Sequence, residues 1–177
     1  MVKIEQGLIQ VYTGNGKGKT TASLGQALRA IGHGLKVYMI QFMKGWKGYG
    51  ELQAAKKLYP NLVIEQFGRI GHVSKEKPEK IDFENAKKAL LKAKEIMLSG
   101  EWDILILDEI NIALDFGLIK LDEVLELIKS KPKNVELILT GRNAPKEIID
   151  IADLVSEVVE VKHPYQKNVK ARMGIEY

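Results

Sequence analysis

The stretch that most constrains the fold is the loop at residues 14–21, which reads GNGKGKTT. It follows an apolar run, LIQVYTG from Leu8, and precedes a run with helical periodicity at residues 20–31. Glycines allow positive φ and close backbone approach, so successive N–H groups can surround phosphate oxygens at the start of a helix. The loop therefore predicts a nucleoside triphosphate site at a strand-to-helix junction.

Individual residues of this loop have separate expected roles. Lys19 can reach across the phosphates, and the Thr20 hydroxyl suits Mg²⁺, which prefers oxygen ligands. Lys17 is an extra cation, either a phosphate contact or a lysine facing solvent. The strict pattern G-x-x-x-x-G-K-[ST] is not met, because Thr13 stands where the first glycine belongs. The loop is therefore a variant of that pattern.

The rest of the chain alternates short apolar runs with longer amphipathic ones. Such alternation predicts an α/β fold in which a parallel sheet of about six strands carries helices on both faces. With 177 residues and no evident linker, we expect a single domain over residues 1–177. The expected strands are residues 8–14, 36–42, 62–67, 103–109, 135–141 and 157–163, and the expected helices are residues 20–31, 51–58, 83–97, 121–128 and 145–152.

Two acids, Asp108 and Glu109, follow the apolar core of one expected strand directly. Open α/β sheets bind ligands at the carboxyl ends of their strands, so these carboxylates are placed to face the phosphate loop. An acid pair there can also cap the next helix. Beside a phosphate loop, the favoured role is to hold a magnesium ion opposite Thr20.

Composition excludes several classes of protein. The chain has no cysteine, which excludes disulfides, cysteine-ligated zinc and protein-bound iron–sulfur clusters. Its 27 basic residues are spread among 23 acidic ones, so we expect no nucleic-acid surface. No apolar run reaches the length of a membrane span, and the N-terminus lacks the apolar region of a secretory signal. We therefore expect a cytoplasmic protein that does not bind membranes.

Seven sequence blocks, taken in order, closely resemble the ATP:corrinoid adenosyltransferases that carry a phosphate-binding loop. The resemblance runs from about Leu8 to Tyr177. The blocks are TGNGKGKTTASLGQALRAIGHG, QFMKGWKGYGE, LILDEINIALDFGLI, ILTGRNAP, ADLVSEV, VKHPY and GIEY.

The resemblance implies a RecA-like, three-layer P-loop fold and a homodimer. It implies transfer of the 5′-deoxyadenosyl group of ATP to the Co(I) of a corrinoid, such as cobalamin, cobinamide or cobyrinic acid a,c-diamide. Tripolyphosphate is released, in adenosylcobalamin biosynthesis. Mg²⁺, or Mn²⁺ in its place, is the implied ion. An electron-donating flavoprotein or another reductase is the implied partner.

The resemblance also assigns site residues by position. It implies Lys19, Thr20 and Glu109 as catalytic, and Thr20, Glu109 and the neighbouring Asp108 as the metal side. The family is thought to bind ATP in reverse orientation along its loop. Arg29 and Arg142 also lie in matching blocks. Each is expected either to contact the nucleotide or to have a structural role. The implied ATP-binding set is Gly14, Asn15, Gly16, Lys17, Gly18, Lys19, Thr20, Thr21, Arg29 and Arg142.

One segment departs from the family pattern. Better-known members carry a Phe-Thr-Trp segment after the third strand that helps to displace the lower corrinoid ligand. Residues 67–76 read FGRIGHVSKE here, without tryptophan. Phe67 and His72 are the corrinoid candidates in this segment. Phe42, Trp46 and Tyr49 are further candidates, with core or rim packing as the alternative.

Two other functions compete with the transferase reading. In a P-loop ATPase, Glu109 would activate water for attack on the γ-phosphate, giving ADP and orthophosphate. A nucleotide switch or RNA-associated module would need a basic stripe with stacking aromatics or a recognisable nucleic-acid motif, and the sequence shows neither. His33 and His163 are expected to be turn residues, and no histidine is assigned as a catalytic base.

Overall fold

The computed structural model describes residues 3–177, and its centre is a six-stranded, fully parallel sheet with the strand order β3-β2-β4-β5-β1-β6. The α/β fold expected from the sequence is confirmed. The strands are β1 (Ile9–Thr13), β2 (Val37–Phe42), β3 (Leu62–Phe67), β4 (Ile104–Asp108), β5 (Glu136–Thr140) and β6 (Leu154–Glu157). The helices are α1 (Lys19–Gly32), α2 (Gly50–Leu58), α3 (Lys80–Leu98), α4 (Ile110–Asp115), α5 (Leu121–Lys129), α6 (Lys146–Ile151) and the 3₁₀ helix η1 (Pro164–Lys167).

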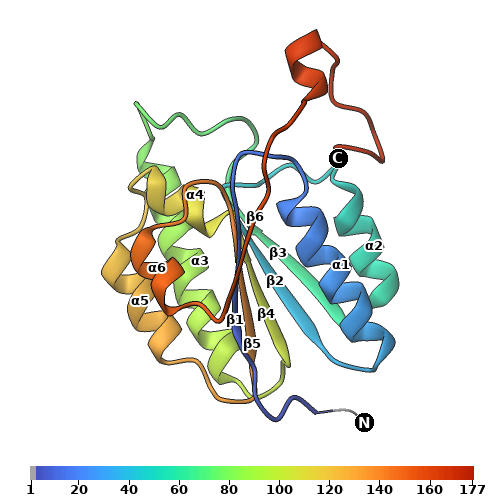
Figure 1. Cartoon of the computed structure of the whole chain (residues 1–177), viewed down its shortest axis with the longest axis vertical. Helices are drawn as coiled ribbons and strands as arrows, with labels where there is room; N and C mark the ends of the chain where they lie inside the picture. Colours follow the sequence, from blue (N-terminus) through green and yellow to red (C-terminus); the bar gives the residue numbers. More distant parts are fainter. Residues whose placement is uncertain (1–2) are drawn as a thin grey trace.

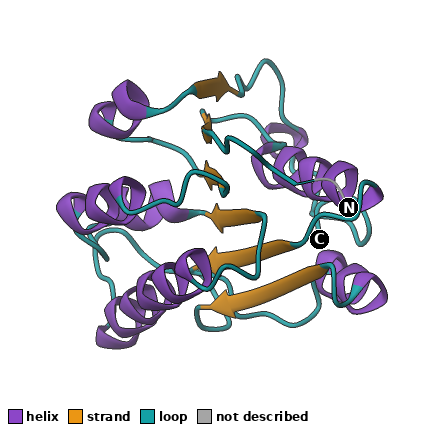
Figure 2. Ribbon diagram, turned by 90° about the horizontal axis from the view of Figure 1, so that it is seen from below, coloured by secondary structure: helices purple, strands orange, loops and turns teal. Residues whose placement is uncertain are grey.

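Helices cover both faces of this sheet. α1 and α2 lie on one face, and α3, α4, α5 and α6 lie on the other (Figures 1 and 2). The strands are buried from both sides, as expected for a parallel sheet in an α/β protein. In β4, Ile104 and Ile106 pack in the core under α1 and α2, whereas Leu105 and Leu107 pack in the core under α3 and α5. The two-residue period of the strand therefore supplies both cores.

Several observed elements differ from the sequence expectation. The helix α4 was not anticipated; it begins directly after Glu109, whose left-handed conformation turns the chain out of β4. The last strand was expected at residues 157–163, but β6 is Leu154–Glu157. β6 pairs with β1, and Val158 N still donates to Thr13 O at 2.8 Å. β1 ends at Thr13, where the glycine loop turns away, so residues beyond Val158 have no strand to pair with.

The fold places four loops at one edge of the sheet. The segments that follow β1, β2, β4 and β5 all leave the carboxyl ends of neighbouring parallel strands. After β6 the chain rises above this edge, forms η1 and returns, so that its end lies beside the start of α2 (Figure 1). Within residues 3–177, no helix is both long and apolar enough to cross a membrane.

Candidate nucleotide-binding site

The loop between β1 and α1 is shaped by its glycines. Gly14 and Gly18 have φ of 94° and 128°, a region that favours glycine. A Cβ on Gly14 would lie 2.5 Å from Val158 O, so any side chain there would collide with the segment after β6. Gly18 caps α1 without a side-chain hydrogen bond, and the first turn of α1 has no acidic residue. The positive end of α1 therefore faces the loop without a carboxylate from its own first turn.

Lys19 is folded back into this loop. Its Nζ donates to Gly14 O at 2.7 Å and to Gly16 O at 2.6 Å, and the residue is buried. Burial lowers the pKa of Lys19, with Arg142 acting in the same direction, against the opposing charges of Glu109 and Asp108. An ammonium has three donors, so one N–H of Lys19 remains for an anion in the cavity that it lines.

Asp108 is a fully buried carboxylate whose two oxygens are both satisfied by the protein. Its Oδ1 accepts from Thr20 Oγ1 and from Thr140 Oγ1, each at 2.8 Å. Its Oδ2 accepts from Lys44 Nζ at 2.7 Å and from Gln41 Nε2 at 3.3 Å. Four donors fill the acceptor positions of this side chain. Asp108 therefore orients Thr20 and Lys44 rather than presenting an open oxygen to a ligand.

Glu109 differs from Asp108 in having one carboxylate oxygen without a hydrogen-bond partner, which we call its open oxygen. Its Oε2 is buried and has no hydrogen-bond partner, while its backbone N–H donates to Thr140 Oγ1 at 3.0 Å. Its φ of 65° is unusual for a residue with a side chain and costs about 1 kcal/mol. Burial raises the pKa of Glu109, with Asp108 adding to the rise and Lys44, Lys19 and Arg142 opposing it. Of the two acids, Glu109 is the one placed to meet a ligand.

The oxygen groups beside the loop fit a magnesium ion. Thr20 gives its single proton to Asp108, which leaves the lone pairs of its hydroxyl free to coordinate. Glu109 adds the open carboxylate oxygen. Residues 3–177 contain no cluster of three or more histidine and acidic side chains that would hold a metal ion by itself. Mg²⁺ commonly uses one or two protein oxygens together with phosphates and water, so such a cluster is not required.

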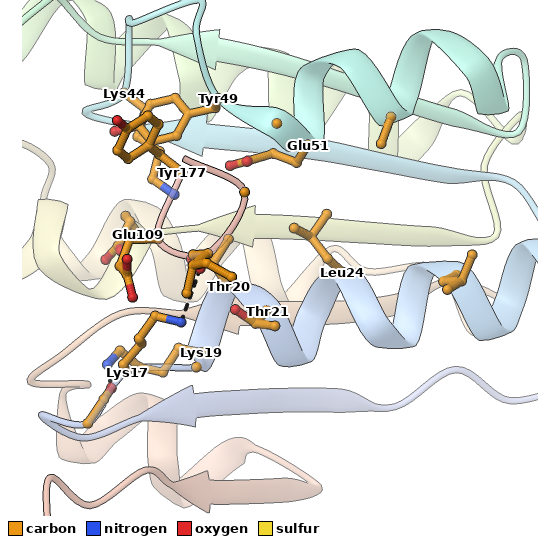
Figure 3. Close-up of a pocket in the computed structure, with 18 of the residues that line it drawn as sticks. Lys17, Lys19, Thr20, Thr21, Leu24, Lys44, Tyr49, Glu51, Glu109 and Tyr177 are labelled. Atoms are coloured by element: carbon orange, nitrogen blue, oxygen red, sulfur yellow. Dashed lines mark hydrogen bonds between the residues drawn. The ribbon is translucent and has the colours of Figure 1, made fainter. Parts of the chain in front are cut away.

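These groups line one cavity of about 660 Å³ (Figure 3). Its polar side includes Lys44, which the sequence reasoning missed. Lys44 follows β2 and lies across the cavity from Lys19, and its side chain is 17% exposed. The only sequence signal for Lys44 is its place just after a strand, at the ligand-binding edge. The predicted site residues that line the cavity are Gly16, Lys17, Gly18, Lys19, Thr20, Thr21, Glu109 and Arg142.

Four residues of the predicted ATP and metal sets do not line the cavity: Gly14, Asn15, Asp108 and Arg29. Gly14 and Asp108 act through Lys19 and Thr20, as their hydrogen bonds show. Arg29 is nine residues beyond Thr20 on α1, which is about 13 Å along the helix axis. Its neighbour Leu28 lines the cavity at almost the same height on α1, so Arg29 as a nucleotide contact stays a prediction.

The corrinoid candidates are scattered rather than gathered on one surface. Phe42 is fully buried in the core, so it offers no docking face and this assignment is wrong. Phe67 packs against the same core. His72 is exposed and Trp46 is 40% exposed, and neither lines the cavity. Tyr49 does line it, in edge-to-face contact with Trp46 at 5.2 Å between ring centroids.

The segment after β3, where the family pattern is lost, is fastened at several points. Arg69 pairs with Asp82 at 2.8 Å and with Glu79 at 2.9 Å, at the start of α3. Val73 is buried in the core, and Lys75 pairs with Asp115 at 2.8 Å. The chain therefore holds this segment in place by charge pairs and one apolar anchor.

Part of the cavity wall comes from the end of the chain, which the sequence reasoning used only to recognise the family. His163 was expected to be a turn residue, and its Nδ1 does accept from Tyr165 N at 3.1 Å in the turn that begins η1. It also lines the cavity, which the sequence did not predict. Gly174, Ile175, Glu176 and Tyr177 line it as well. Residues more than 150 positions apart meet here, and no local spacing signals that contact.

Comparisons with known proteins identify the family to which the sequence is similar. Residues 5–177 match the family model described as ATP:corrinoid adenosyltransferase BtuR/CobO/CobP. The chain is 39% identical over 176 residues to the corrinoid adenosyltransferase of Sinorhizobium sp., covering 98% of this chain and 81% of that protein. It is 37% identical over 173 residues to the corrinoid adenosyltransferase of Escherichia coli K12, covering 98% of this chain and 87% of that protein.

Solved structures show the same fold. The flagellar accessory protein FlaH of Methanocaldococcus jannaschii superposes with a TM-score of 0.62 at 16% identity, covering 87% of this chain and 72% of that one. The RadB recombinase superposes with a TM-score of 0.54 at 15% identity, covering 91% of this chain and 78% of that one. These likenesses establish a P-loop, RecA-like fold, as expected. Together with the family match over nearly the whole sequence, they show that the chain belongs to the ATP:corrinoid adenosyltransferase family.

Proposed function

We propose that this protein transfers the 5′-deoxyadenosyl group of ATP to the Co(I) of a corrinoid. In this reaction the electron pair of Co(I) attacks C5′ of the ribose, a Co–C bond forms, and the C5′–O bond breaks. The bonding electrons leave with tripolyphosphate. The observation that supports this most directly is the convergence of Lys17, Lys19, Lys44 and Arg142 on one cavity beside the glycine loop.

The chemistry explains why so many cations suit the site. The leaving group carries several negative charges, so the protein has to bind the triphosphate and hold C5′ open to cobalt. Lys19 and the first N–H groups of α1 bind the phosphates from one side, and Lys44 adds positive charge from the other. The attacking atom is the cobalt of the substrate, so no side chain has to act as nucleophile.

A magnesium ion is part of this proposal, with Mn²⁺ as an alternative because it takes the same oxygen ligands. Thr20 and Glu109 would hold the ion together with the phosphates, and Asp108 would keep the Thr20 hydroxyl oriented. When bound, the ion neutralises part of the charge that grows on the triphosphate.

Several further features are carried over as parts of the same proposal. The corrinoid is cobalamin, cobinamide or cobyrinic acid a,c-diamide, and the reaction serves adenosylcobalamin biosynthesis. The protein acts as a single-domain homodimer in the cytoplasm, and a flavoprotein or another reductase delivers the electron that makes Co(I). Gel filtration tests the dimer, and activity with each corrinoid ranks the substrates.

The experiment mixes the protein with ATP, Mg²⁺ and chemically reduced cobalamin without oxygen and follows the loss of Co(I) absorbance. Loss of Co(I) is expected with the wild type. Lys19→Ala should remove nearly all turnover because it deletes a phosphate contact, whereas Lys47→Ala, at an exposed position beyond β2, should retain it. Circular dichroism checks that both variants are folded. Persistent Co(I) with folded wild type contradicts the proposal.

A second function, ATP hydrolysis, is favoured by one observation. The raised pKa and the open Oε2 of Glu109 suit a base that accepts a proton from water. Hydrolysis predicts orthophosphate release from ATP and Mg²⁺ alone, without a corrinoid. The transferase proposal predicts negligible orthophosphate under those conditions.

A further inference from the structure

The end of the chain forms one side of the cavity and is held at separate points. We call residues 174–177 the closing segment. Lys17 Nζ, in the glycine loop, donates to Ile175 O at 3.3 Å. Gly174 N donates to Tyr177 O at 2.6 Å, which folds the segment into a turn. Figure 3 shows this segment crossing between the elements that carry Glu51 and those that carry Glu109.

Tyr177 is fixed by an aromatic contact rather than by the core. Its ring meets Trp46 edge to face, with centroids 5.2 Å apart and an interplanar angle of 69°. The indole of Trp46 packs against Gly48, where an added Cβ would lie 2.2 Å from the ring. Trp46 also meets Tyr49 edge to face. The three rings therefore form one cluster in which Trp46 contacts both tyrosines.

The cavity has two ends of different chemistry. The glycine loop, Lys19 and Thr20 make a charged end. The opposite end carries the rings of Tyr49 and Tyr177 together with Lys44, whose Nζ lies 5.6 Å from the centroid of the Tyr49 ring. A triphosphate matches the first. The purine base of the same molecule is a flat aromatic group, and it gains most where a ring of fixed orientation is available. The alternative place for the base is the aliphatic strip of α1 and α2, which includes Leu24.

We propose that Tyr177 is a nucleotide-binding residue whose ring packs against the nucleoside of ATP, and that Trp46 is the positioning residue that holds this ring. The proposal rests on the proposed use of ATP. It also gives Trp46 a role other than the corrinoid contact expected from the sequence. The closing segment thus contributes to affinity for the nucleoside, while the glycine loop contributes affinity for the phosphates.

The test compares two ligands, ATP and inorganic tripolyphosphate, which has no base or sugar. Dissociation constants are measured by titration calorimetry with Mg²⁺ present. Tyr177→Ala is expected to weaken ATP binding at least about fivefold, the equivalent of losing one stacked base, and to leave tripolyphosphate binding unchanged. Tyr177→Phe should bind ATP like the wild type, because the ring remains. Tyr165→Ala is the matched control, since this tyrosine of the same region is 78% exposed.

Trp46 is tested through coupling. Trp46→Ala should weaken ATP binding as Tyr177→Ala does, and the double variant should be no weaker than Tyr177→Ala alone, because both changes remove one interaction. Trp46→Phe should restore most of the affinity. Additive losses in the double variant would overturn the positioning role of Trp46.

Three results would overturn the role of Tyr177. One is unchanged ATP affinity in Tyr177→Ala. Another is an equal loss for ATP and tripolyphosphate, which would mean that the closing segment acts on the phosphates. The third is weaker ATP binding in Leu24→Ala together with unchanged ATP binding in Tyr177→Ala, which would put the base between α1 and α2. Wild-type protein that binds ATP without consuming Co(I) would contradict the proposed function and leave this inference standing.

Discussion

Replacing Lys44 by methionine tests the charge pair at the centre of the site. Lys44 Nζ lies 2.7 Å from Asp108 Oδ2, with side-chain exposures of 17% and 0%. Removing one partner of a buried pair commonly costs about 3–5 kcal/mol, because the other charge stays buried. Here the hydroxyls of Thr20 and Thr140 and the amide of Gln41 still donate to Asp108. The loss should therefore be nearer to that of one charged hydrogen bond, about 2 kcal/mol.

Urea unfolding followed by circular dichroism measures this loss in the protein without ligand. Lys44→Met should lower the free energy of unfolding by about 2 kcal/mol, which corresponds to about 4–8 °C in Tm for a chain of this size. Lys47→Met is the matched control, because it removes a lysine from the same loop at an exposed position. Equal stability of Lys44→Met, Lys47→Met and the wild type would mean that the Lys44–Asp108 pair does not stabilise the fold.

The pH dependence of the same difference gives an independent check. Burial lowers the pKa of Lys44, but Asp108, Glu109 and Glu51 outweigh burial, and the net pKa is raised above its ordinary value of 10.5. A raised lysine pKa contributes stability that is complete below pH 10.5 and is lost as pH rises through the folded-state value. The stability gap between wild type and Lys44→Met should therefore narrow above pH 10.5. A gap that stays constant there would contradict this assignment.

Three further predictions concern Glu109, Gly18 and Asp82. Glu109→Gln should reduce turnover about 100-fold and raise the Mg²⁺ concentration needed, without lowering Tm, because it removes a buried charge with an open oxygen; a large fall in Tm would contradict this. Gly18→Ala should lower the unfolding free energy by about 1–2 kcal/mol in thermal melts, from its φ of 128° alone, since a Cβ there meets no atom within 4 Å; wild-type stability would count against it. Burial raises the pKa of Asp82, but hydrogen bonds from Arg69 and from the backbone of Glu79 outweigh burial, and the net pKa is lowered below 3.8. The stability that Asp82 contributes is therefore lost as the pH falls below 3.8, and the stability of Asp82→Asn should depend less on pH in acid than that of the wild type.

The sequence predicted the sheet and the glycine loop because both leave local signals. Continuous apolar runs mark strands buried on both faces, and the loop's glycines mark positive φ at Gly14 and Gly18. Phe42 was assigned to the corrinoid, although the two-residue periodicity of its strand indicates a core position. It follows Tyr38 and Ile40 at intervals of two residues, and all three lie in the same core.

The contacts that complete the site were beyond sequence reasoning. Lys44 reaches Asp108 across 64 positions of sequence, and Lys17 reaches Ile175 across 158. Neither pair has a spacing that helix or strand geometry dictates. They are brought together by the strand order of the sheet and by the path of the chain after β6. The residue pattern alone predicted the acid pair as one unit, and the family resemblance named Glu109 as the catalytic member. The hydrogen bonds give the physical difference, because both oxygens of Asp108 are satisfied and Glu109 Oε2 has no partner.

In the proposed reaction, the site binds the triphosphate as a leaving group and leaves C5′ open to cobalt. Phosphorus NMR of a reaction with limiting ATP, Mg²⁺ and excess cob(I)alamin identifies the products directly. One tripolyphosphate is expected for each corrinoid consumed. ADP and orthophosphate in place of tripolyphosphate would contradict it.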